Sequence, residues 1–402
     1  MKGTGARRLD VLDVFRGLAV AGMILVTSPG DWMHSYWWLQ HAHWQGWTPA
    51  DMVFPGFLVA AGVALGLSFP RDLSRPGTRA ALWRRVLRRV VALILLGLAV
   101  NLVYSLKMLD HAPWIDFPGL AVVRIPGVLQ RIGLCYLAGV ALILAFPHRL
   151  PGGRIDADPR GLLLAGAVLL IGYWLLLTFV PVPGYGVGRL DQEGNLAAYI
   201  DRALFTVPHL WPLGAVQWGG PVVYDPEGLL ATLPAIVNVL AGILAARALR
   251  RAPEPVAMVQ LLLGGAALIA CGLLLDPVFP IIKPLWTSSF ALLSSGVALI
   301  VLAVLAGALE SRAVAALCTP LRILGTNAVL GFVLSVVMAK IGEAPWVPAP
   351  GGPITPQAWG FGIASRLFAD PVIASTACAL GVLGIVIACL WPLHRRNWRF
   401  RL

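Results

Sequence analysis

The sequence predicts an all-α, polytopic integral membrane protein with about ten transmembrane helices, and three observations predict it. Of its 402 residues, 58% are hydrophobic and only 12% are charged, whereas a soluble globular domain carries about 25% charge. The mean hydropathy is +0.79. Apolar runs recur along the whole chain, so there is no room for a large separate soluble domain. We therefore expect a single membrane domain over residues 1–402.

Each apolar run is long enough to form one membrane-spanning helix, which needs roughly 20 residues. The expected spans lie near residues 11–29, 51–69, 84–105, 127–147, 161–180, 228–248, 257–275, 285–308, 321–341 and 370–391.

The net charge of +12 follows from membrane topology. If Met1 is cytoplasmic, the loops that hold most of the 31 basic residues all fall on the cytoplasmic side, as the positive-inside rule requires. Both termini are then cytoplasmic, and no nucleic-acid partner is needed to explain the charge. The first span shows no cleavage pattern of a signal peptide. The five cysteines lie in or beside spans as apolar packing residues, and no metal site is expected.

The segment HAHWQGWTPAD (41–51) precedes the second span. Thr48 and Pro49 are typical of a helix start, with Asp51 three residues after the N-cap. Trp44 and its neighbouring tryptophans form an interfacial belt. An anchor of this kind does not need histidine. His41 is therefore a candidate nucleophile or general base, with Asp51 as the group that holds or polarises it, directly or through water.

Several blocks of the sequence resemble one family, in order and over nearly the whole chain. They are LDVLDVFRGLAVAGMILV (9–26), HAHWQGWTPADMVFPGFLVAAGVAL (41–65), RIPGVLQRIGLCYL (124–137), DPEGLLATLPAIVNVLAG (225–242), KPLWTSSFALLSSG (283–296) and LGTNAV (324–329). The HAxWxGxTxAD and RIPGVLQR blocks are the most specific of these. Together they resemble the heparan-α-glucosaminide N-acetyltransferase family.

The resemblance implies a transmembrane acyltransferase domain that moves acetyl from cytosolic acetyl-CoA to the amine of a glucosamine-type sugar on the far side. The active histidine of the family is the first histidine of the HAxW motif, here His41, acting through an acetyl-histidine or as a base in direct transfer. Family members commonly carry Asn where this chain has Thr27. The resemblance also suggests a homodimer, and the absence of an amino-terminal extension suggests a bacterial inner membrane.

Further polar residues in or near the spans are candidates for the two substrates. On the donor side we expect Arg124, Arg131 and Lys283 to bind anionic or carbonyl groups, with Ser288 and Asn327 beside the CoA chain. On the acceptor side we expect Thr27, Trp44, Glu227 and Trp286. Structural interpretations stay open: Arg131 could pair with Asp51, Asp225 could be the N-cap of the sixth span, and Ser288 could be a packing contact. The arginines of residues 84–89 either reflect topology or attract the CoA phosphates.

Two other functions remain open from the sequence. A sugar transporter or carrier on the same scaffold would use His41 and Asp51 to relay protons. A non-catalytic membrane module would bind a glycan or a protein partner, and Thr27 in place of the usual asparagine is the feature that favours it. Gradient-driven uptake without acetyl-CoA would indicate the carrier, whereas tight binding of CoA would argue against the module.

Overall fold

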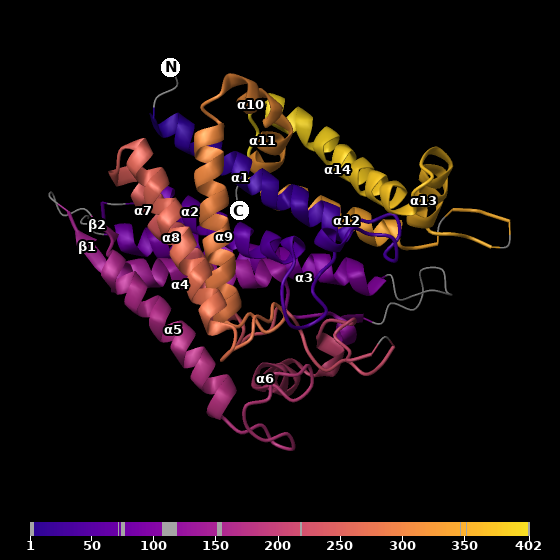
Figure 1. The fold of residues 1–402 in the computed structure, drawn as a ribbon, viewed down its shortest axis with the longest axis horizontal. Coiled ribbons are helices and arrows are strands. Elements are labelled where there is room, and N and C mark those ends of the chain that lie inside the picture. Colours follow the sequence, from indigo (N-terminus) through magenta and orange to yellow (C-terminus); the bar gives the residue numbers. More distant parts are fainter. Residues whose placement is uncertain are drawn as a thin grey trace.

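The computed structural model describes residues 4–70, 72–73, 77–106, 119–150, 155–217, 219–345, 347–350 and 352–400. These residues fold into a bundle of long helices joined by loops (Figure 1). The α-helices are α1 (Thr4–Thr27), α2 (Val53–Ser68), α3 (Thr78–Leu106), α4 (Val128–Ala145), α5 (Pro159–Phe179), α6 (Leu196–Phe205), α7 (Thr232–Arg251), α8 (Glu254–Leu275), α9 (Ser288–Ala308), α10 (Arg312–Leu317), α11 (Thr319–Thr326), α12 (Ala328–Gly342), α13 (Pro356–Leu367) and α14 (Pro371–Arg395). The strands β1 (Pro147–Arg149) and β2 (Ile155–Ala157) form a small antiparallel hairpin.

The predicted all-α membrane fold is confirmed. Within the described residues, eight helices are long and apolar enough to cross a membrane. A ninth candidate is the pair α11 and α12, which bends by 91° at its break and replaces the straight helix expected at 321–341. The span expected at 11–29 is helical as α1, but Asp10, Asp13 and Arg16 interrupt its apolar stretch.

One predicted helix start is wrong. Asp225 was expected to cap the sixth span, but α7 begins only at Thr232. The Asp225 carboxylate instead accepts two hydrogen bonds from Arg124 and one from the backbone N–H of Glu227. Because these donors occupy the carboxylate, residues 225–231 form a turn ahead of the helix.

The centre of the bundle is the close pair α2 and α7. A Cβ atom added at Gly62 would lie 2.1 Å from the carbonyl oxygen of Val239, and one added at Gly242 would lie 2.1 Å from that of Val59. Small residues at such crossings let two backbones approach closely. The main apolar core surrounds this pair with buried side chains from α1, α4 and α9.

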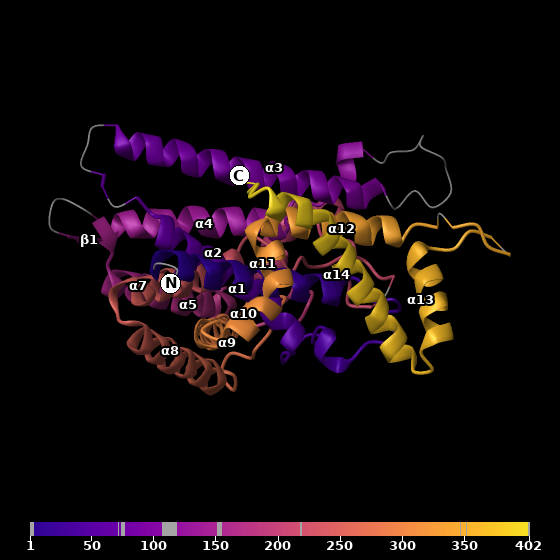
Figure 2. The ribbon, with the colours of Figure 1, turned by 90° about the horizontal axis from the view of Figure 1, so that it is seen from above.

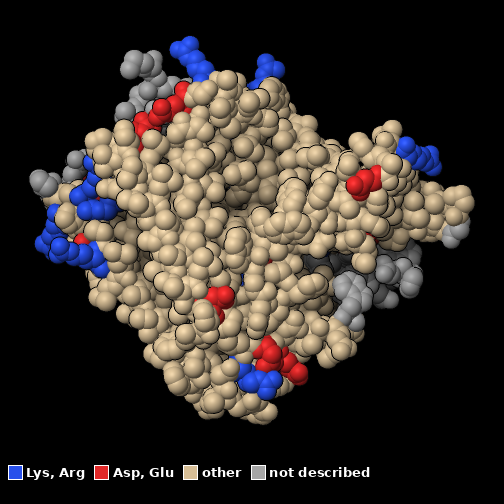
Figure 3. Space-filling model, in the orientation of Figure 1, with Lys and Arg blue, Asp and Glu red and all other residues tan. Residues whose placement is uncertain are grey.

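The two ends of the bundle differ in character. At one end, Asp156 of β2 accepts hydrogen bonds from three arginines near the end of α7: Arg247, Arg250 and Arg251. The ion pair between Arg399 and Asp13 places the C-terminal segment beside the first half of α1, so both termini lie on one side (Figure 2). The face in Figure 3 is largely uncharged, and its basic side chains gather at its edges. The opposite end carries α6 and the loops around residues 41 and 283 (Figure 1).

Candidate active site

His41, Asp51 and Lys283 form one hydrogen-bonded cluster at the start of the second span. His41 Nδ1 lies 2.8 Å from Asp51 Oδ1. Lys283 Nζ lies 3.0 Å from the same Oδ1, 2.8 Å from His41 Nδ1 and 3.3 Å from His41 Nε2. Asp51 is 0% exposed, whereas the side chain of His41 is 48% exposed. The buried carboxylate thus holds an imidazole that a substrate can reach.

The local sequence fixes Asp51 through a helix start. Pro49–Met52 form a single turn, η2, which leads directly into α2. The Oδ2 atom of Asp51 accepts the backbone N–H of Thr48 at 2.9 Å and that of Ala42 at 3.2 Å. The bond from Thr48 belongs to the capping box expected from the Thr-Pro-Ala-Asp sequence. Because Ala42 follows His41 directly, the same carboxylate positions both the backbone and the ring of the histidine.

Lys283 reaches the cluster from the loop between α8 and α9. Gly46 donates its N–H to the carbonyl oxygen of Ile281 at 2.8 Å, which joins the histidine loop to the lysine loop. Asp276 in turn accepts the N–H of Ile281 at 2.7 Å and holds that loop in shape. Backbone pairing therefore brings Lys283 to a site more than 200 residues earlier in the chain.

The contacts indicate which ring nitrogen is available for chemistry. A carboxylate only accepts hydrogen bonds, so the proton on the His41 ring belongs on Nδ1, where it points to Asp51. Nε2 then keeps its lone pair. A ring oriented in this way can act as a base or as a nucleophile. The Lys283 ammonium, 3.3 Å from Nε2, can stabilise the oxyanion that forms when a carbonyl is attacked beside it.

Burial and the neighbouring positive charge of Lys283 hold the pKa of His41 below its ordinary value of 6.5, although Asp51 acts in the opposite direction. The ring is therefore neutral at neutral pH and gains its proton only as the pH falls below that range. Burial likewise lowers the pKa of Lys283, against the opposing effect of Asp51.

This arrangement predicts the pH dependence of any reaction in which His41 must be neutral. The rate should fall on the acid side, with a midpoint below 6.5. Lys283→Met removes the positive charge that opposes protonation, so the acid midpoint should move to higher pH even if the maximal rate also falls. The pH profile of kcat/KM for both proteins measures this shift. An unchanged or lower midpoint in the variant would show that Lys283 does not control the histidine.

A second polar group lies next to the cluster. Arg124 donates through Nε to Asp225 Oδ2 at 2.8 Å and through Nη2 to Asp225 Oδ1 at 2.6 Å, and it also binds Glu227. Arg124 is partly buried, which on its own would lower its pKa, but the two carboxylates raise the pKa above the ordinary value. Arg124 and Glu227, expected to bind the donor and the acceptor amine, are thus already paired with each other.

Arg131 lies deeper and has unused donors. The residue is 1% exposed. Its Nη2 donates to the carbonyl oxygen of Gly228 at 3.0 Å, and its guanidinium stacks on the Trp286 ring at 4.8 Å. Nε and Nη1 have no hydrogen-bond partner among the described residues. The pairing of Arg131 with Asp51 that the sequence left open is not made, because Asp51 is held by His41 and Lys283 instead.

Trp286 connects this arginine to the cluster. Its φ of +51° is unusual for a residue other than glycine, and such strain concentrates at functional sites. Its Nε1 donates to Asn238 Oδ1 at 2.9 Å, and its ring packs edge-on against Phe54, three residues after Asp51. The backbone N–H of Trp286 also donates to the carbonyl oxygen of Lys283 at 2.8 Å, so Trp286 and the arginine stacked on it lie close to the cluster.

Other predicted site residues have structural contacts. Ser288 donates to the carbonyl oxygen of Leu170 in α5. The Thr27 hydroxyl donates to the carbonyl oxygen of Met23, four residues earlier in α1. Asn327 lies at the break between α11 and α12, where it binds the backbone of Trp398 and Phe400. Trp44 donates to the carbonyl oxygen of Leu190 and packs edge-on against Tyr224. None of these contacts involves His41, Asp51 or Lys283.

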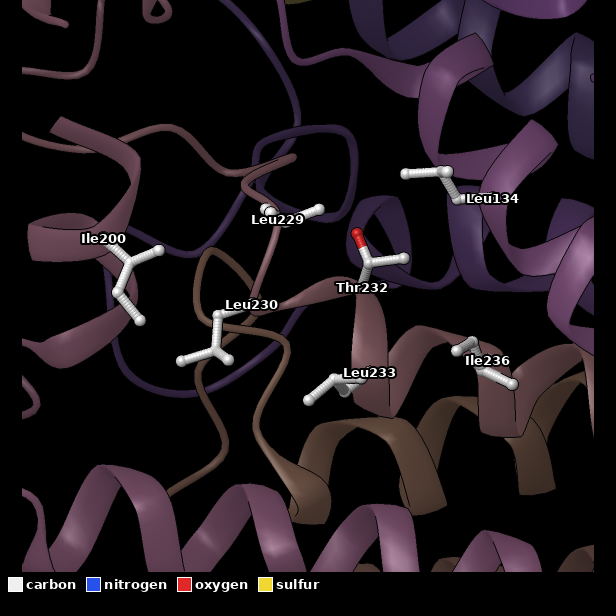
Figure 4. A pocket seen from close by; sticks show the side chains of 7 residues that line it. All are labelled: Leu134, Ile200, Leu229, Leu230, Thr232, Leu233 and Ile236. Carbon is white, nitrogen blue, oxygen red and sulfur yellow. The ribbon is translucent and has the colours of Figure 1, made fainter. Parts of the chain in front are cut away.

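Sequence reasoning missed Asp201, which lies on α6 and is 1% exposed. Its Oδ1 accepts the N–H of Leu229 at 2.9 Å, while its Oδ2 has no hydrogen-bond partner among the described residues. Leu229 and Ile200 beside it line an apolar cavity of about 260 Å³, in which the Thr232 hydroxyl is the polar group (Figure 4). Asp201 falls in a short amphipathic helix, so its sequence suggests a surface residue. Its burial against Gly228 and Leu229, in the turn before α7, is visible only in the fold.

Burial raises the pKa of Asp201 from 3.8 to about 7. A carboxyl with a raised pKa favours folding most at low pH, and stability is lost as the pH rises from about 4 to about 7. Asp201→Asn cannot ionise, so its advantage over the native protein should grow across that interval, towards a few kcal/mol. Thermal unfolding of both proteins from pH 4 to 8 measures the difference.

Asp191→Asn, in the loop between α5 and α6, is the matched control. Burial would raise the pKa of Asp191, but the hydrogen bond and charge of Arg189 together with the hydrogen bond from the Gly194 N–H outweigh burial and lower it. Loss of this carboxylate should therefore cost stability as the pH rises, the opposite of Asp201→Asn. Parallel unfolding curves for Asp201→Asn and the native protein would mean that Asp201 does not titrate in this interval.

Comparison with known proteins supports the family. Residues 8–262 match the model of the family described as "Heparan-alpha-glucosaminide N-acetyltransferase, catalytic". The chain is 35% identical over 270 residues to the human protein named heparan-alpha-glucosaminide N-acetyltransferase, covering 60% of this chain and 38% of that protein. It is 34% identical over 274 residues to the mouse protein of the same name, covering 61% and 40%. The chain thus matches about two fifths of the length of these relatives. With the matched region covering most of the chain and including His41 and Asp51, the protein belongs to the heparan-α-glucosaminide N-acetyltransferase family.

Proposed function

We propose that this protein is a transmembrane N-acetyltransferase, which moves acetyl from acetyl-CoA on the cytoplasmic side to the amine of a glucosamine-type sugar on the outer side. The observation that carries the proposal is the His41–Asp51–Lys283 cluster, since it presents an oriented, reachable imidazole at one end of the bundle. Family membership supports the reaction class. Placing the basic end of the bundle in the cytoplasm puts His41 on the outer side.

Two routes use the same geometry. In the covalent route, His41 Nε2 attacks the acetyl carbonyl carbon, the C–S bond breaks, and CoA leaves as a thiolate that takes up a proton. The sugar amine then attacks the acetyl-imidazole, forms the amide, loses a proton and frees the histidine. In the direct route, Nε2 accepts the proton of the amine as its nitrogen attacks the thioester, and then passes that proton to the departing sulfur.

The surrounding residues fit supporting roles in either route. Lys283 lies near Nε2, where it can stabilise the oxyanion of the tetrahedral intermediate. Arg131 stacks on Trp286, and two of its donor atoms have no partner within the part of the chain that the structure describes. It can therefore bind the acetyl carbonyl or a neighbouring amide of the CoA chain. Trp44, three residues after His41, offers an aromatic surface for the acceptor sugar.

The proposal is tested with purified protein in detergent, acetyl-labelled acetyl-CoA and glucosamine. The expected product is labelled N-acetylglucosamine, formed in proportion to the protein present. Incubation without glucosamine separates the two routes, because only the covalent route leaves labelled acetyl on the protein. Binding of acetyl-CoA without transfer to glucosamine or to glucosamine-terminated oligosaccharides would refute this acceptor class. Absence of both binding and transfer would refute the enzyme.

A further inference from the structure

One peptide group in the turn before α7 is held from both sides by buried charged side chains. The carbonyl oxygen of Gly228 accepts a hydrogen bond from Arg131 Nη2 at 3.0 Å, and the N–H of Leu229 donates to Asp201 Oδ1 at 2.9 Å. These two backbone groups belong to one planar unit, because a peptide bond joins the carbonyl of one residue to the N–H of the next. Arg131 on α4 and Asp201 on α6 are therefore connected through the Gly228–Leu229 peptide.

The two charges match the dipole of this peptide. The guanidinium lies at the carbonyl end, which is the negative end of the dipole, and the carboxylate lies at the positive N–H end. Arg131 and Asp201 are each 1% exposed, and Arg131 is close enough to act electrostatically on Asp201. A buried charge is costly unless another group compensates it. The shared peptide thus stabilises both side chains.

Asp201 also explains why residue 228 is a glycine. A Cβ atom added at Gly228 would lie 1.8 Å from Asp201 Oδ2 and 2.6 Å from its Cγ. Gly228 is not among the glycines with positive φ, so its backbone conformation does not itself require glycine. The Gly228 carbonyl also accepts a hydrogen bond from the Thr232 hydroxyl at 3.1 Å. Three side chains therefore fix this one peptide at the start of α7.

The surroundings of the peptide are mainly apolar. In Figure 4, Leu229 lies between Ile200 of α6, the neighbour of Asp201, and Leu134 of α4, three residues after Arg131. These side chains line the cavity of about 260 Å³ beside the turn. Hydrogen bonds to charged groups are stronger in such surroundings than in water. The link between the two helices is therefore well placed to transmit a change at Asp201 to Arg131.

The same link sets the direction of the remaining donors of Arg131. Its Nη2 is fixed by Gly228, and its guanidinium stacks on the ring of Trp286 at 4.8 Å. Because a guanidinium is planar and rigid, these two contacts also fix where Nε and Nη1 point. Neither atom has a hydrogen-bond partner among the described residues. Trp286 in turn donates its backbone N–H to the carbonyl oxygen of Lys283, so these donors lie near the catalytic cluster.

We propose that Asp201 is a positioning residue, which acts through the Gly228–Leu229 peptide to orient Arg131 towards the carbonyl group of a bound acyl donor. Asp201 itself does not touch the donor. This inference rests on the proposed function, because acetyl-CoA is the donor named there. It accounts for a buried aspartate on a short helix that meets the peptide group held by Arg131.

A double-mutant cycle in the full-length protein tests the connection. Arg131→Met keeps an unbranched apolar chain but removes the donors, and it should lower kcat/KM for acetyl-CoA by about 10². Asp201→Ala should lower kcat/KM about tenfold. If Asp201 acts through Arg131, the double variant should be no slower than Arg131→Met alone, because the second substitution then has no oriented guanidinium left to disturb.

Asn195→Ala is the matched control for loosening of α6. Asn195 is 0% exposed, and its side chain caps the same helix through bonds to residues 191, 192 and 198. Its loss should lower the thermal unfolding midpoint but keep kcat/KM within about threefold of the native value, since a lost cap affects stability. Equal loss of kcat/KM in Asn195→Ala and Asp201→Ala would assign the effect to docking of α6 and overturn the inference.

Two further variants isolate the hydrogen bond to the peptide. Asp201→Asn keeps an oxygen that can accept the N–H of Leu229, so it should stay within about threefold of the native kcat/KM. Gly228→Ala keeps both charged residues but displaces the carboxylate, so it should lose about as much as Asp201→Ala. Gly228→Ala also keeps the test available if Asp201→Ala does not fold.

Binding measurements give a readout that does not depend on turnover. Acetonyl-CoA carries a ketone with a CH₂ group between carbonyl and sulfur, so it cannot transfer an acetyl group, whereas CoA has no carbonyl at that place. Calorimetry in detergent should show about tenfold weaker binding of acetonyl-CoA to Arg131→Met and to Asp201→Ala. Binding of CoA should be equal in the native protein and both variants.

The outcomes distinguish this inference from the proposed function. Binding of acetonyl-CoA that depends on Asp201 and Arg131, without acetyl transfer by the native protein, would uphold the positioning role and refute the transferase. Acetyl transfer in which Asp201→Ala costs the same factor with and without Arg131 would refute the positioning role alone. Equal weakening of CoA and acetonyl-CoA would show that Arg131 does not face the acyl carbonyl and would also overturn the inference.

Discussion

His41→Ala is expected to lower kcat for acetyl transfer by about 10² to 10⁴. The reason is the geometry of one ring: Asp51 holds Nδ1 at 2.8 Å, so Nε2 is the group available to take the acetyl group or a proton. Alanine supplies neither function. Initial rates with acetyl-CoA and glucosamine at several pH values measure the loss, and the residual rate should no longer show the acid limb.

His43→Ala is the matched control for this substitution. His43 is also exposed and belongs to the same motif, two residues further on, but His41 is the ring that contacts Asp51 and Lys283. The control should keep nearly the full rate. Equal thermal unfolding midpoints for both variants would show that His41→Ala acts on chemistry. Retention of activity by His41→Ala would remove His41 from the mechanism.

Asp51→Asn is expected to lower kcat by a similar factor of about 10² to 10⁴ and to lower stability as well. An amide in this position can donate as well as accept, so it no longer fixes the proton of His41 on Nδ1. It also leaves the Lys283 ammonium without its carboxylate partner in a buried place. KM should change much less than kcat, because the group does not contact substrate directly.

Thr48→Val separates the structural role of Asp51 from its effect on the histidine. The Thr48 hydroxyl bonds to Gln40 and to Asp51, but the backbone N–H that holds Asp51 remains in the variant. Stability should fall by about 1 kcal/mol, with kcat nearly unchanged. If Thr48→Val lost as much rate as Asp51→Asn, the effect of Asp51 would be structural only.

The helices could be predicted from the sequence because each span is a long apolar run with recognisable ends. The Thr-Pro-Ala-Asp start of the second span and the Asp-Pro start of α5 are where their residue types require them. The break at Asn327 was not predicted, because the bonds that hold it come from Trp398 and Phe400. The turn at Asp225 was missed for a similar reason, since its partner is Arg124.

Part of the candidate site could also be predicted. His41 and Asp51 belong to one short motif, so their proximity follows from a helix start that the sequence encodes. The place of Lys283 beside them depends on pairing between two loops that are distant in the chain. Arg131 was identified as a buried arginine, but its stacking on Trp286 and its unused donors depend on how α4 packs against the loop before α9.

The most direct test of the central claim uses sealed proteoliposomes of one orientation, with labelled acetyl-CoA on the basic side of the protein and glucosamine on the side of His41. We predict labelled N-acetylglucosamine on the His41 side with the native protein and none with His41→Ala. Product that appears only on the donor side, or movement of glucosamine itself without any need for acetyl-CoA, would contradict acetyl transfer across the membrane at His41.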